Sequence, residues 1–414
     1  MKQLPPIAAF LFCCLTAQFA TAESPIKPGD HIAIVGNTFA DQLRIHGYLE
    51  TLLLQHTTDD PVTVRNLGWG GDMLTARDRP TGFPTEESTL TAHKTDVIIA
   101  CFGMGESFAG EKGLAPFESQ LKAFISSHAG KTYNGKSEVR LILVSPIASE
   151  DLGKLTPARD KRNRDLQSYT HAMRDVASDA GVPFVDLFEA SNYLMNEPIG
   201  PKLTTNGIHL NSYGYWAISH EFFKQLTERA PNCGWLLRID AAAKSADGEG
   251  VEISKMTSDE TGLRFLVKET SAPKLRPPTN QPLPPQLESV RDTLTVANLK
   301  PGKYRLTVDK KPVASGTAQE WAEGVAIDSS PTHEAAESYH AAVNDKNLQF
   351  TYSWKALNQV HIVGERKKSP SGRALPGEVI EFDRLAKERD EALRNGIELK
   401  TRVWKLSRVE SNDK

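Results

Sequence analysis

The chain has 414 residues, of which 39% are hydrophobic and 24% charged, so it has enough apolar content for a sizeable globular core. Its length favours a main domain with an addition over one compact unit. The formal net charge of -3 gives no sign of nucleic acid or an anionic membrane surface as a partner.

The first 22 residues have the features of a secretory signal peptide. Lys2 precedes an apolar run around residues 7–15, and Ala20-Thr21-Ala22 forms an A-x-A cleavage site. We therefore expect cleavage after Ala22 and a secreted or periplasmic mature protein. No later apolar run is long enough to cross a bilayer, so we expect no membrane span.

Short apolar strands then alternate with helical stretches from Ile26 to about Ala230, a pattern typical of a parallel sheet covered by helices. The sequence predicts an α/β fold with a mostly parallel five-stranded sheet flanked by helices. The expected strands are 31–36, 62–68, 96–103, 139–146 and 183–188. The expected helices are 41–54, 115–127, 162–180 and 213–229.

The pattern of residue types in the sequence changes after Pro231. Residues 233–316 contain short alternating segments broken by a proline-rich stretch, 273–286, and are expected to form a small β-rich unit with antiparallel strands. Residues 317–414 are expected to be a helical, charged C-terminal extension whose charged face is solvated. Its scattered tryptophans suggest that the helices dock back on the rest of the protein.

Two cysteines remain after removal of the signal peptide. Export would permit a disulfide between Cys101 and Cys233, but Cys101 ends an apolar run in which a buried thiol is the commoner arrangement. Two free thiols are the favoured interpretation, and pairing stays open.

Glycines and polar residues occur together at four places at or just beyond strand ends. These are residues 36–38, 66–72, 103–107 and 206–209. Because the carboxyl ends of parallel strands meet at one edge of an open α/β sheet, we expect these loops to converge on one crevice. Trp69 and Trp216 flank the loops and are expected to wedge between helix and sheet.

The order of these loops resembles the SGNH, or GDSL-like, hydrolase family, over roughly residues 28–227. The family has Gly-Asp-Ser after the first strand, a glycine in its second block, Gly-x-Asn-Asp in the third, and Asp-x-x-His near the end. The matching positions here are Gly36-Asn37-Thr38, Asn66 to Gly71, Gly103-Met104-Gly105-Glu106 and Asn206-Gly207-Ile208-His209. The resemblance implies a flavodoxin-like three-layer hydrolase domain over residues 23–232, and the hydrolysis of acyl esters.

The resemblance also shows three departures from the family pattern. Thr38 stands in place of the nucleophilic serine, Gly105 in place of the oxyanion asparagine, and Asn206 in place of the aspartate, while His209 and the block-two glycine Gly71 are kept. A threonine has a stiff χ1, and an asparagine supplies no charge to stabilise an imidazolium. The implied catalytic residues are Thr38, His209 and Asn206, and the implied oxyanion or substrate residues are Gly71, Gly105, Asn37, Asp72 and Glu106.

The sequence leaves three functions open. The leading one is a secreted hydrolase acting on a small-molecule or glycan ester, such as a carbohydrate O-acetyl group, with a degenerate catalytic set and no cofactor. The alternative is a carbohydrate-binding protein that has lost turnover. In a third, Asp72, Glu106 and His209 hold a divalent ion or act as an acid–base set, although the two carboxylates are more simply explained as helix caps. No metal ion and no nucleic-acid partner are expected.

Overall fold

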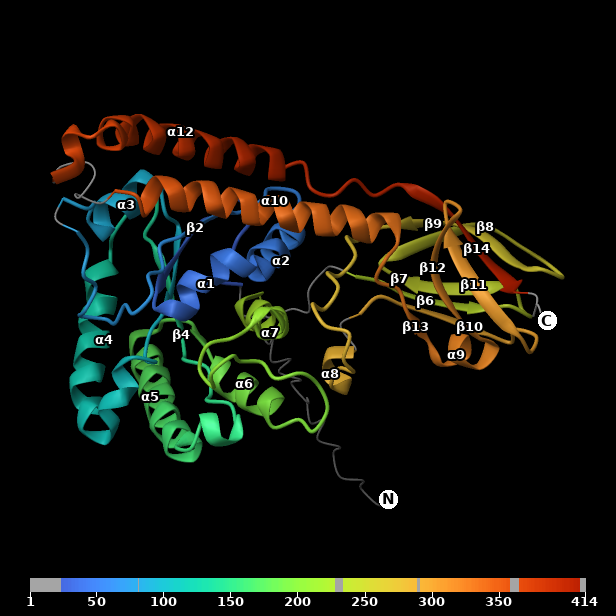
Figure 1. The fold of residues 1–414 in the computed structure, drawn as a ribbon, viewed down its shortest axis with the longest axis horizontal. Helices are drawn as coiled ribbons and strands as arrows, with labels where there is room; N and C mark the ends of the chain where they lie inside the picture. Colours follow the sequence, from blue (N-terminus) through green and yellow to red (C-terminus); the bar gives the residue numbers. More distant parts are fainter. Residues whose placement is uncertain (1–23, 81, 228–233, 289–290, 358–364, 410–414) are drawn as a thin grey trace, which may run out of the picture.

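The computed structural model describes residues 24–80, 82–227, 234–288, 291–357 and 365–409. An α/β part and a β-sandwich lie side by side along the long axis of the molecule, and two long helices run across the α/β part (Figure 1). The expected signal peptide at residues 1–22 and Cys233 both lie outside the described residues. Cys101 is buried at the end of its strand.

The α/β part is built on a five-stranded, all-parallel sheet, which confirms the predicted fold class. The strand order is β2-β1-β3-β4-β5. β3 is buried along its whole length, because helices cover both faces of the sheet. The strands are β1 (His31–Gly36), β2 (Thr63–Asn66), β3 (Val97–Cys101), β4 (Arg140–Val144) and β5 (Phe184–Val185).

The two faces of this sheet have separate apolar cores. On one face, Ile32 and Ile34 pack among side chains of α1 (Thr38–His46), α2 (Tyr48–His56), α6 (Leu187–Met195) and α7 (Ser212–Thr227). On the other face, Ala33 and Val35 pack among side chains of α3 (Glu86–Ala92), α4 (Leu114–His128) and α5 (Arg159–Ala180). The single helix expected at 41–54 is two helices, because Gly47 adopts a left-handed conformation with φ 60° and ends α1.

The second part is a sandwich of two sheets, with strand orders β13-β10-β6-β7 and β12-β11-β14-β9-β8. Trp235, Phe265, Trp321 and Trp404 fill its core. The β6–β10 pair is parallel, whereas the sequence led us to expect antiparallel strands. The strands are β6 (Leu236–Asp240), β7 (Ser245–Glu249), β8 (Val251–Asp259), β9 (Gly262–Glu269), β10 (Thr293–Ala297), β11 (Lys303–Val308), β12 (Lys311–Thr317), β13 (Val325–Ala326) and β14 (Thr401–Val409), with short helices α8 (Pro285–Glu288) and α9 (Ala318–Glu323).

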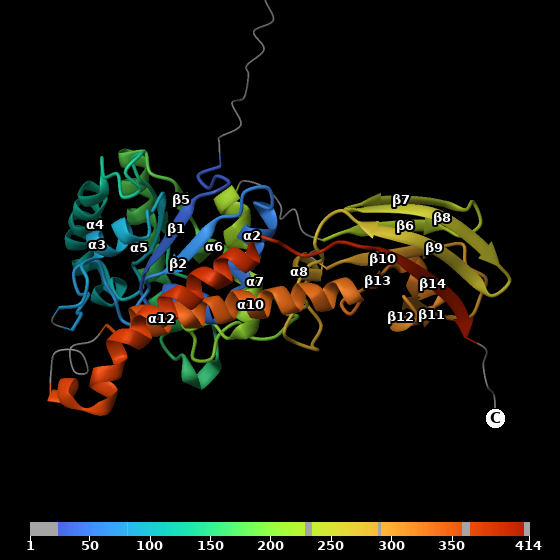
Figure 2. The same ribbon diagram turned by 90° about the horizontal axis from the view of Figure 1, so that it is seen from above.

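The C-terminal helices α10 (Pro331–Trp354) and α12 (Pro370–Leu393) pack against each other and lie beside α1, α2 and β2 (Figures 1 and 2). The expected helical character does not extend to the end of the chain. Residues 401–409 form β14, because Trp404 and Leu406 alternate with exposed or half-buried residues and fill the sandwich core. In the part of the chain that the structure describes, no helix combines the length and apolar content that a bilayer crossing requires.

Candidate functional site

Thr38 is the first residue of α1, immediately after β1. Gly36 ends β1 with φ 130°, and a Cβ there would lie 2.1 Å from the carbonyl oxygen of Cys101, so only glycine fits. Asn37 caps α1, its Oδ1 accepting a hydrogen bond of 3.0 Å from the N–H of Phe39. The half-buried Thr38 hydroxyl therefore lies at a helix N-terminus, where the helix dipole favours developing negative charge.

Gly71 approaches Thr38 directly. Its backbone N–H donates to Thr38 Oγ1 over 3.3 Å, and its φ of 88° orients that N–H in a conformation that other residues rarely adopt. The loop is held close by a second bond, in which Trp69 N donates to the carbonyl of Gly36 at 2.9 Å. A hydroxyl and a backbone donor thus lie side by side, as a nucleophile and an oxyanion donor must.

His209 lies on the exposed loop before α7 and pairs with Asn206. Asn206 Nδ2 is 3.0 Å from His209 Nδ1. The orientation of the amide is fixed, because Asn206 Oδ1 already accepts backbone N–H bonds from Ile208 at 3.3 Å and His209 at 2.9 Å. The amide therefore donates to Nδ1, and the neutral imidazole carries its proton on Nε2.

This arrangement differs from the one that general-base catalysis by His209 requires. An asparagine that accepted a hydrogen bond from Nδ1–H would leave Nε2 free to act as a base, but here the asparagine oxygen is taken by its own loop. A general base that accepts a hydroxyl proton at Nε2 needs the opposite tautomer. Asn206 consequently favours a hydrogen-bond donor at His209 Nε2.

Glu150 fixes the loop that carries His209. Its buried carboxylate accepts bonds from Leu203 N at 3.0 Å, Thr204 N at 2.8 Å and Thr204 Oγ1 at 2.6 Å. Its own N–H donates to the carbonyl of Gly207 at 2.8 Å. Nothing in the sequence distinguished Glu150, because its partners lie more than fifty residues away along the chain.

Gly105 occupies the position of the missing oxyanion asparagine. A Cβ added there would lie 2.8 Å from Met73 Cγ, so the Met73 side chain already occupies the space beside it. Its φ of -67° suits any residue. The loss of a side-chain donor at position 105 is therefore coupled to Met73, a residue that no sequence motif singles out.

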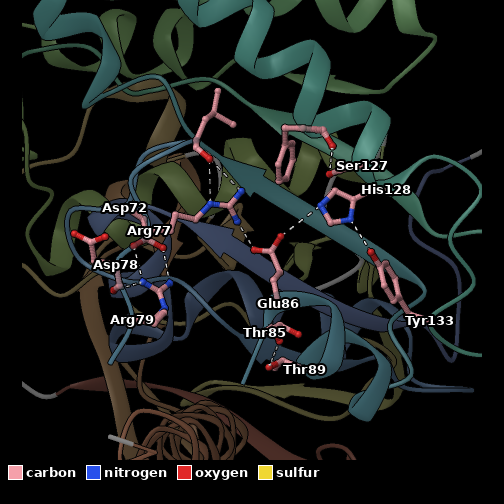
Figure 3. Close-up of polar contacts among 12 residues, drawn as sticks. Asp72, Arg77, Asp78, Arg79, Thr85, Glu86, Thr89, Ser127, His128 and Tyr133 are labelled. Carbon is pink, nitrogen blue, oxygen red and sulfur yellow. Dashed lines mark hydrogen bonds and ion pairs between the residues drawn. The ribbon is translucent and has the colours of Figure 1, made fainter. Parts of the chain in front are cut away.

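The carboxylates of Asp72 and Glu106 both have structural partners. Asp72 is buried and receives two hydrogen bonds from Arg79, at 2.8 and 2.6 Å (Figure 3). Glu106 Oε1 accepts from Leu74 N and Oε2 from Gly103 N, both at 2.9 Å, so it joins two of the loops. Glu106 lies in the first turn of the 3-10 helix Glu106–Gly113 and binds the N–H of Gly103 just before it, as an acidic residue at a helix start does, whereas the carboxylate of Asp72 is bound by Arg79. Within the described ranges, no group of three or more His, Cys, Asp or Glu side chains is placed to hold a metal ion.

The loop beyond Asp72 is fixed by a chain of polar contacts that extends to α4 (Figure 3). Arg77 forms an ion pair with Glu86. Glu86 Oε1 lies 3.5 Å from His128 Nε2, and His128 Nδ1 is 2.9 Å from the Tyr133 hydroxyl. Burial alone would raise the pKa of Glu86, but His128 and Arg77 outweigh it and lower that pKa. These polar contacts hold in place the loop that carries Gly71.

Trp69, in the same loop, contacts the C-terminal helices. Its ring lies 4.5 Å from the Arg79 guanidinium and 4.8 Å from the Lys355 ammonium, and 5.7 Å from the ring of Trp354. Trp216 is fully buried instead, and its Nε1 donates to the carbonyl of Leu275. The structure thus places Trp354 and Lys355, from the C-terminal extension, beside the loop of Gly71.

The structure brings three of the four expected loops into direct contact, namely those of Thr38, Gly71 and Glu106. The His209 loop is linked to them indirectly, since the hydroxyl of Tyr215 on α7 donates to the carbonyl of Phe39 at 3.2 Å. Among the described residues no hydrogen bond joins the side chains of His209 and Thr38. Their action as one catalytic set stays a prediction.

A cavity of about 740 Å³ lies away from these loops, between the α/β part and the sandwich. It is lined by residues at the end of α2 and at the start of β6, together with the stretch that leads into β14. The end of α2 precedes β2, so the cavity borders the amino-terminal edge of the sheet, opposite Thr38. Despite its volume, this cavity is not the candidate site, because none of the expected catalytic side chains lines it.

The chain has similarities to known proteins in its sequence and its fold. Residues 29–217 match the model of the GDSL-like Lipase/Acylhydrolase family. No curated protein matches the sequence. The solved structure of BT4096, a gut microbial diltiazem-metabolizing enzyme, has a TM-score of 0.67 and 17% identity and covers 93% of this chain and 99% of its own. That of Axe2, an acetylxylan esterase from Geobacillus stearothermophilus, has a TM-score of 0.38 and 18% identity and covers 49% of this chain and 96% of its own.

The similarity to BT4096 shows that the whole architecture, including the sandwich and the C-terminal helices, occurs in another protein. The similarity to Axe2 is confined to about half of the chain. The strand order, the four loops and the match over residues 29–217 agree with one another. The chain carries an α/β domain that belongs to the GDSL-like, or SGNH, family of lipases and acylhydrolases.

Proposed function

We propose that the α/β domain hydrolyses acyl esters at a site made of Thr38, Gly71 and the His209 loop. The observation that carries this proposal is the Gly71 N–H, 3.3 Å from Thr38 Oγ1 at the start of α1. A hydroxyl beside a fixed backbone donor at a helix N-terminus is the arrangement that stabilises the oxyanion formed when a hydroxyl attacks an ester carbonyl. The family match supports the same reaction class.

In this reaction Thr38 Oγ1 attacks the carbonyl carbon, and His209 removes the hydroxyl proton and delivers it to the departing alcohol. Water then releases the acyl group from Thr38, with His209 acting again as the base. Gly71 N–H holds the oxyanion, and Asn37 supports the start of α1. His209 must exchange its Nε2 proton for one on Nδ1 before it can act, and the bond from Asn206 opposes that exchange. We therefore propose a slow hydrolase with a degenerate catalytic set.

As the substrate class we propose O-acetyl or similar small acyl esters on a carbohydrate. His209, Asn206 and Gly71 are all exposed, so the alcohol part of the ester is not limited by an enclosing pocket. This openness suits a glycan chain better than a small ligand that must be enclosed. We also propose that the protein is exported, on the strength of the A-x-A site ending at Ala22.

A second candidate function is ligand binding without turnover, and the bond from Asn206 to His209 favours it. With its proton on Nε2, His209 offers a donor that can bind a carbonyl or hydroxyl group of a glycan. The two functions use the same residues and differ only in whether a bond of the ligand is broken. The acid–base or metal arrangement receives no support, since both carboxylates are occupied by Arg79 and by backbone N–H groups.

The test is a panel of acetylated glycans and aryl acetates with the purified chain and the variants Thr38→Ala and His209→Ala. The proposal requires that the parent chain hydrolyses at least one of these esters and that each substitution lowers the rate. Hydrolysis that survives both substitutions would show that another group is responsible. Glycan binding with no measurable hydrolysis, weakened by His209→Ala, would establish the second candidate instead.

A further inference from the structure

The outer face of the sheet β12-β11-β14-β9-β8 is strongly cationic. On its three inner strands, β9, β14 and β11, side chains alternate between the sandwich core and the exterior. The outward positions of these strands include five exposed cations and no Asp or Glu. We call this surface the basic face and define it by Arg264, Lys268, Lys303, Arg305 and Lys405.

The strand register places like charges together on the basic face. Lys405 on β14 is directly opposite Arg264 on β9. Arg305 on β11 pairs with Ser407, two residues from Lys405, so it is a diagonal neighbour of that lysine. Like charges directly across a pair of strands destabilise a sheet. Three adjacent strands therefore each contribute a cation to a cluster that does not favour folding.

Within the part of the chain that the structure describes, the charge of the basic face is only partly compensated. None of the five forms an ion pair with another residue in the described part of the chain, whereas Arg238 on the opposite sheet lies 3.6 Å from both Asp247 and Glu249. Three acids lie at the rim of the face: Glu252 on the edge strand β8 is opposite Lys268, Asp259 at the end of β8 interacts electrostatically with Lys405, and Glu320 on α9 does so with Lys303. The five cations of this face thus lack the direct ion pairs that Arg238 forms on the other sheet.

We propose that the basic face binds an acidic polysaccharide. Neighbouring strands lie about 4.8 Å apart, so a polymer that crosses them with a carboxylate or sulfate on successive sugar residues meets one cation on each of β9, β14 and β11. Thr307, Thr401 and Ser407 supply hydroxyl groups among the cations for sugar hydroxyls. The binding goes beyond the proposed ester hydrolysis and does not depend on it.

Two other classes of polyanion fit less well. Proteins that bind single-stranded nucleic acid on a sheet or groove stack the bases on aromatic rings, and no aromatic residue occupies an outward position on β9, β14 or β11. A membrane-binding surface needs apolar anchors beside its cations. The apolar side chains at such positions are aliphatic and half-buried, among them Leu266 and Val403.

The experiment measures binding of the full chain to polygalacturonate, with neutral xylan as the uncharged comparison. The test variant is Arg264→Glu with Lys405→Glu. The matched control is Lys122→Glu with Lys136→Glu, two exposed lysines of the α/β part whose reversal changes the net charge equally. Thermal unfolding verifies that both variants fold, and aryl acetate turnover reports separately on the ester site.

We expect polygalacturonate to bind, xylan not to bind, and salt to weaken the binding. We expect the test variant to bind at least about tenfold more weakly, because like charge repels the polymer, and the control to stay within about twofold of the parent. Absence of binding to polygalacturonate, or an equal loss in both variants, would overturn the proposal. So would tighter binding of an oligothymidylate or of phosphatidylserine vesicles at the same salt.

Discussion

Lys355 Nζ lies 2.5 Å from Asp41 Oδ1, so a residue just beyond the end of α10 is bonded to the helix that begins at Thr38. The same ammonium lies over the ring of Trp69, in the loop of Gly71. Burial lowers the pKa of Lys355, and Asp41 opposes that shift. The C-terminal extension therefore supports the two segments that form the core of the candidate site.

Replacing Lys355 with methionine should destabilise the protein by about 1–3 kcal/mol, because the partly buried Asp41 loses a charged donor. The loss is limited because Arg44 Nε still donates to Asp41 over 2.8 Å. Urea unfolding measures the change. Lys387→Met removes an ion pair on the solvent side of α12 and serves as the control, with little effect expected. Equal effects of the two substitutions would mean that the contact with Asp41 does not matter.

A second prediction concerns Lys346, which is fully buried where α10 meets α2. Its Nζ lies 2.5 Å from Glu50 Oε1 and donates to the carbonyl of Val64. Lys346→Met should cost about 3–5 kcal/mol, because it leaves the carboxylate of Glu50 buried without its cation. Adding Glu50→Gln removes that charge and should recover much of the loss. A double variant whose destabilisation equals the sum of the two single changes would contradict the pairing.

The burial of Glu269 should make the free energy of unfolding depend on pH. Burial raises its pKa to about 7, against the opposing effect of His333. Because the folded state then binds a proton that the unfolded state releases above pH 4.5, this residue lowers the free energy of unfolding as the pH rises from about 4.5 to 7. The loss is about 3 kcal/mol.

Glu269→Gln should remove this slope and make the protein more stable than the parent above pH 7. Denaturant unfolding at several pH values between 4.5 and 8 measures it. Glu252→Gln changes an exposed carboxylate on the neighbouring strand and should leave the slope as it is. A slope that persists in Glu269→Gln would show that Glu269 is ionised in the folded protein at pH 6.

The sequence predicted the α/β fold because its signals are local. Apolar runs such as residues 32–35 and the glycine after them identify a buried strand and a turn, and the five strands were placed within three residues of their observed ends. Strand β14 was missed because its partners β9 and β11 are distant in sequence. The division of the chain at residues 232 and 316 stays a prediction.

Less of the candidate site than of the fold could be predicted from the sequence. Motif positions led to Thr38, Gly71 and His209, but the direction of the bond between Asn206 and His209 depends on backbone N–H groups that only the folded loop brings to Asn206 Oδ1. The roles of Met73 and Glu150 depend equally on contacts between separate loops. No pattern of residue types records such contacts.

Restoring the oxyanion asparagine should succeed only when space is made for it. Gly105→Asn places its Cβ against Met73 Cγ, so alone it should give little increase in ester turnover. Combined with Met73→Ala, it should raise kcat for an aryl acetate by up to about 10²-fold over Met73→Ala alone, the effect of one oxyanion donor. Equal turnover in Met73→Ala with and without Gly105→Asn would show that position 105 does not face the oxyanion.

The central claim is that Thr38, Gly71 and His209 form an ester-hydrolysing site whose rate is limited by the hydrogen bond that Asn206 donates to His209. It is tested most directly by the kcat/KM for an aryl acetate in Asn206→Asp, measured beside the parent chain and Asn206→Asp with Thr38→Ala. A carboxylate accepts from Nδ1–H and frees Nε2 as the base, so kcat/KM should rise by about 10²–10⁴-fold and fall back when Thr38 is removed. An unchanged kcat/KM in Asn206→Asp, or an increase that persists without the Thr38 hydroxyl, would contradict the account.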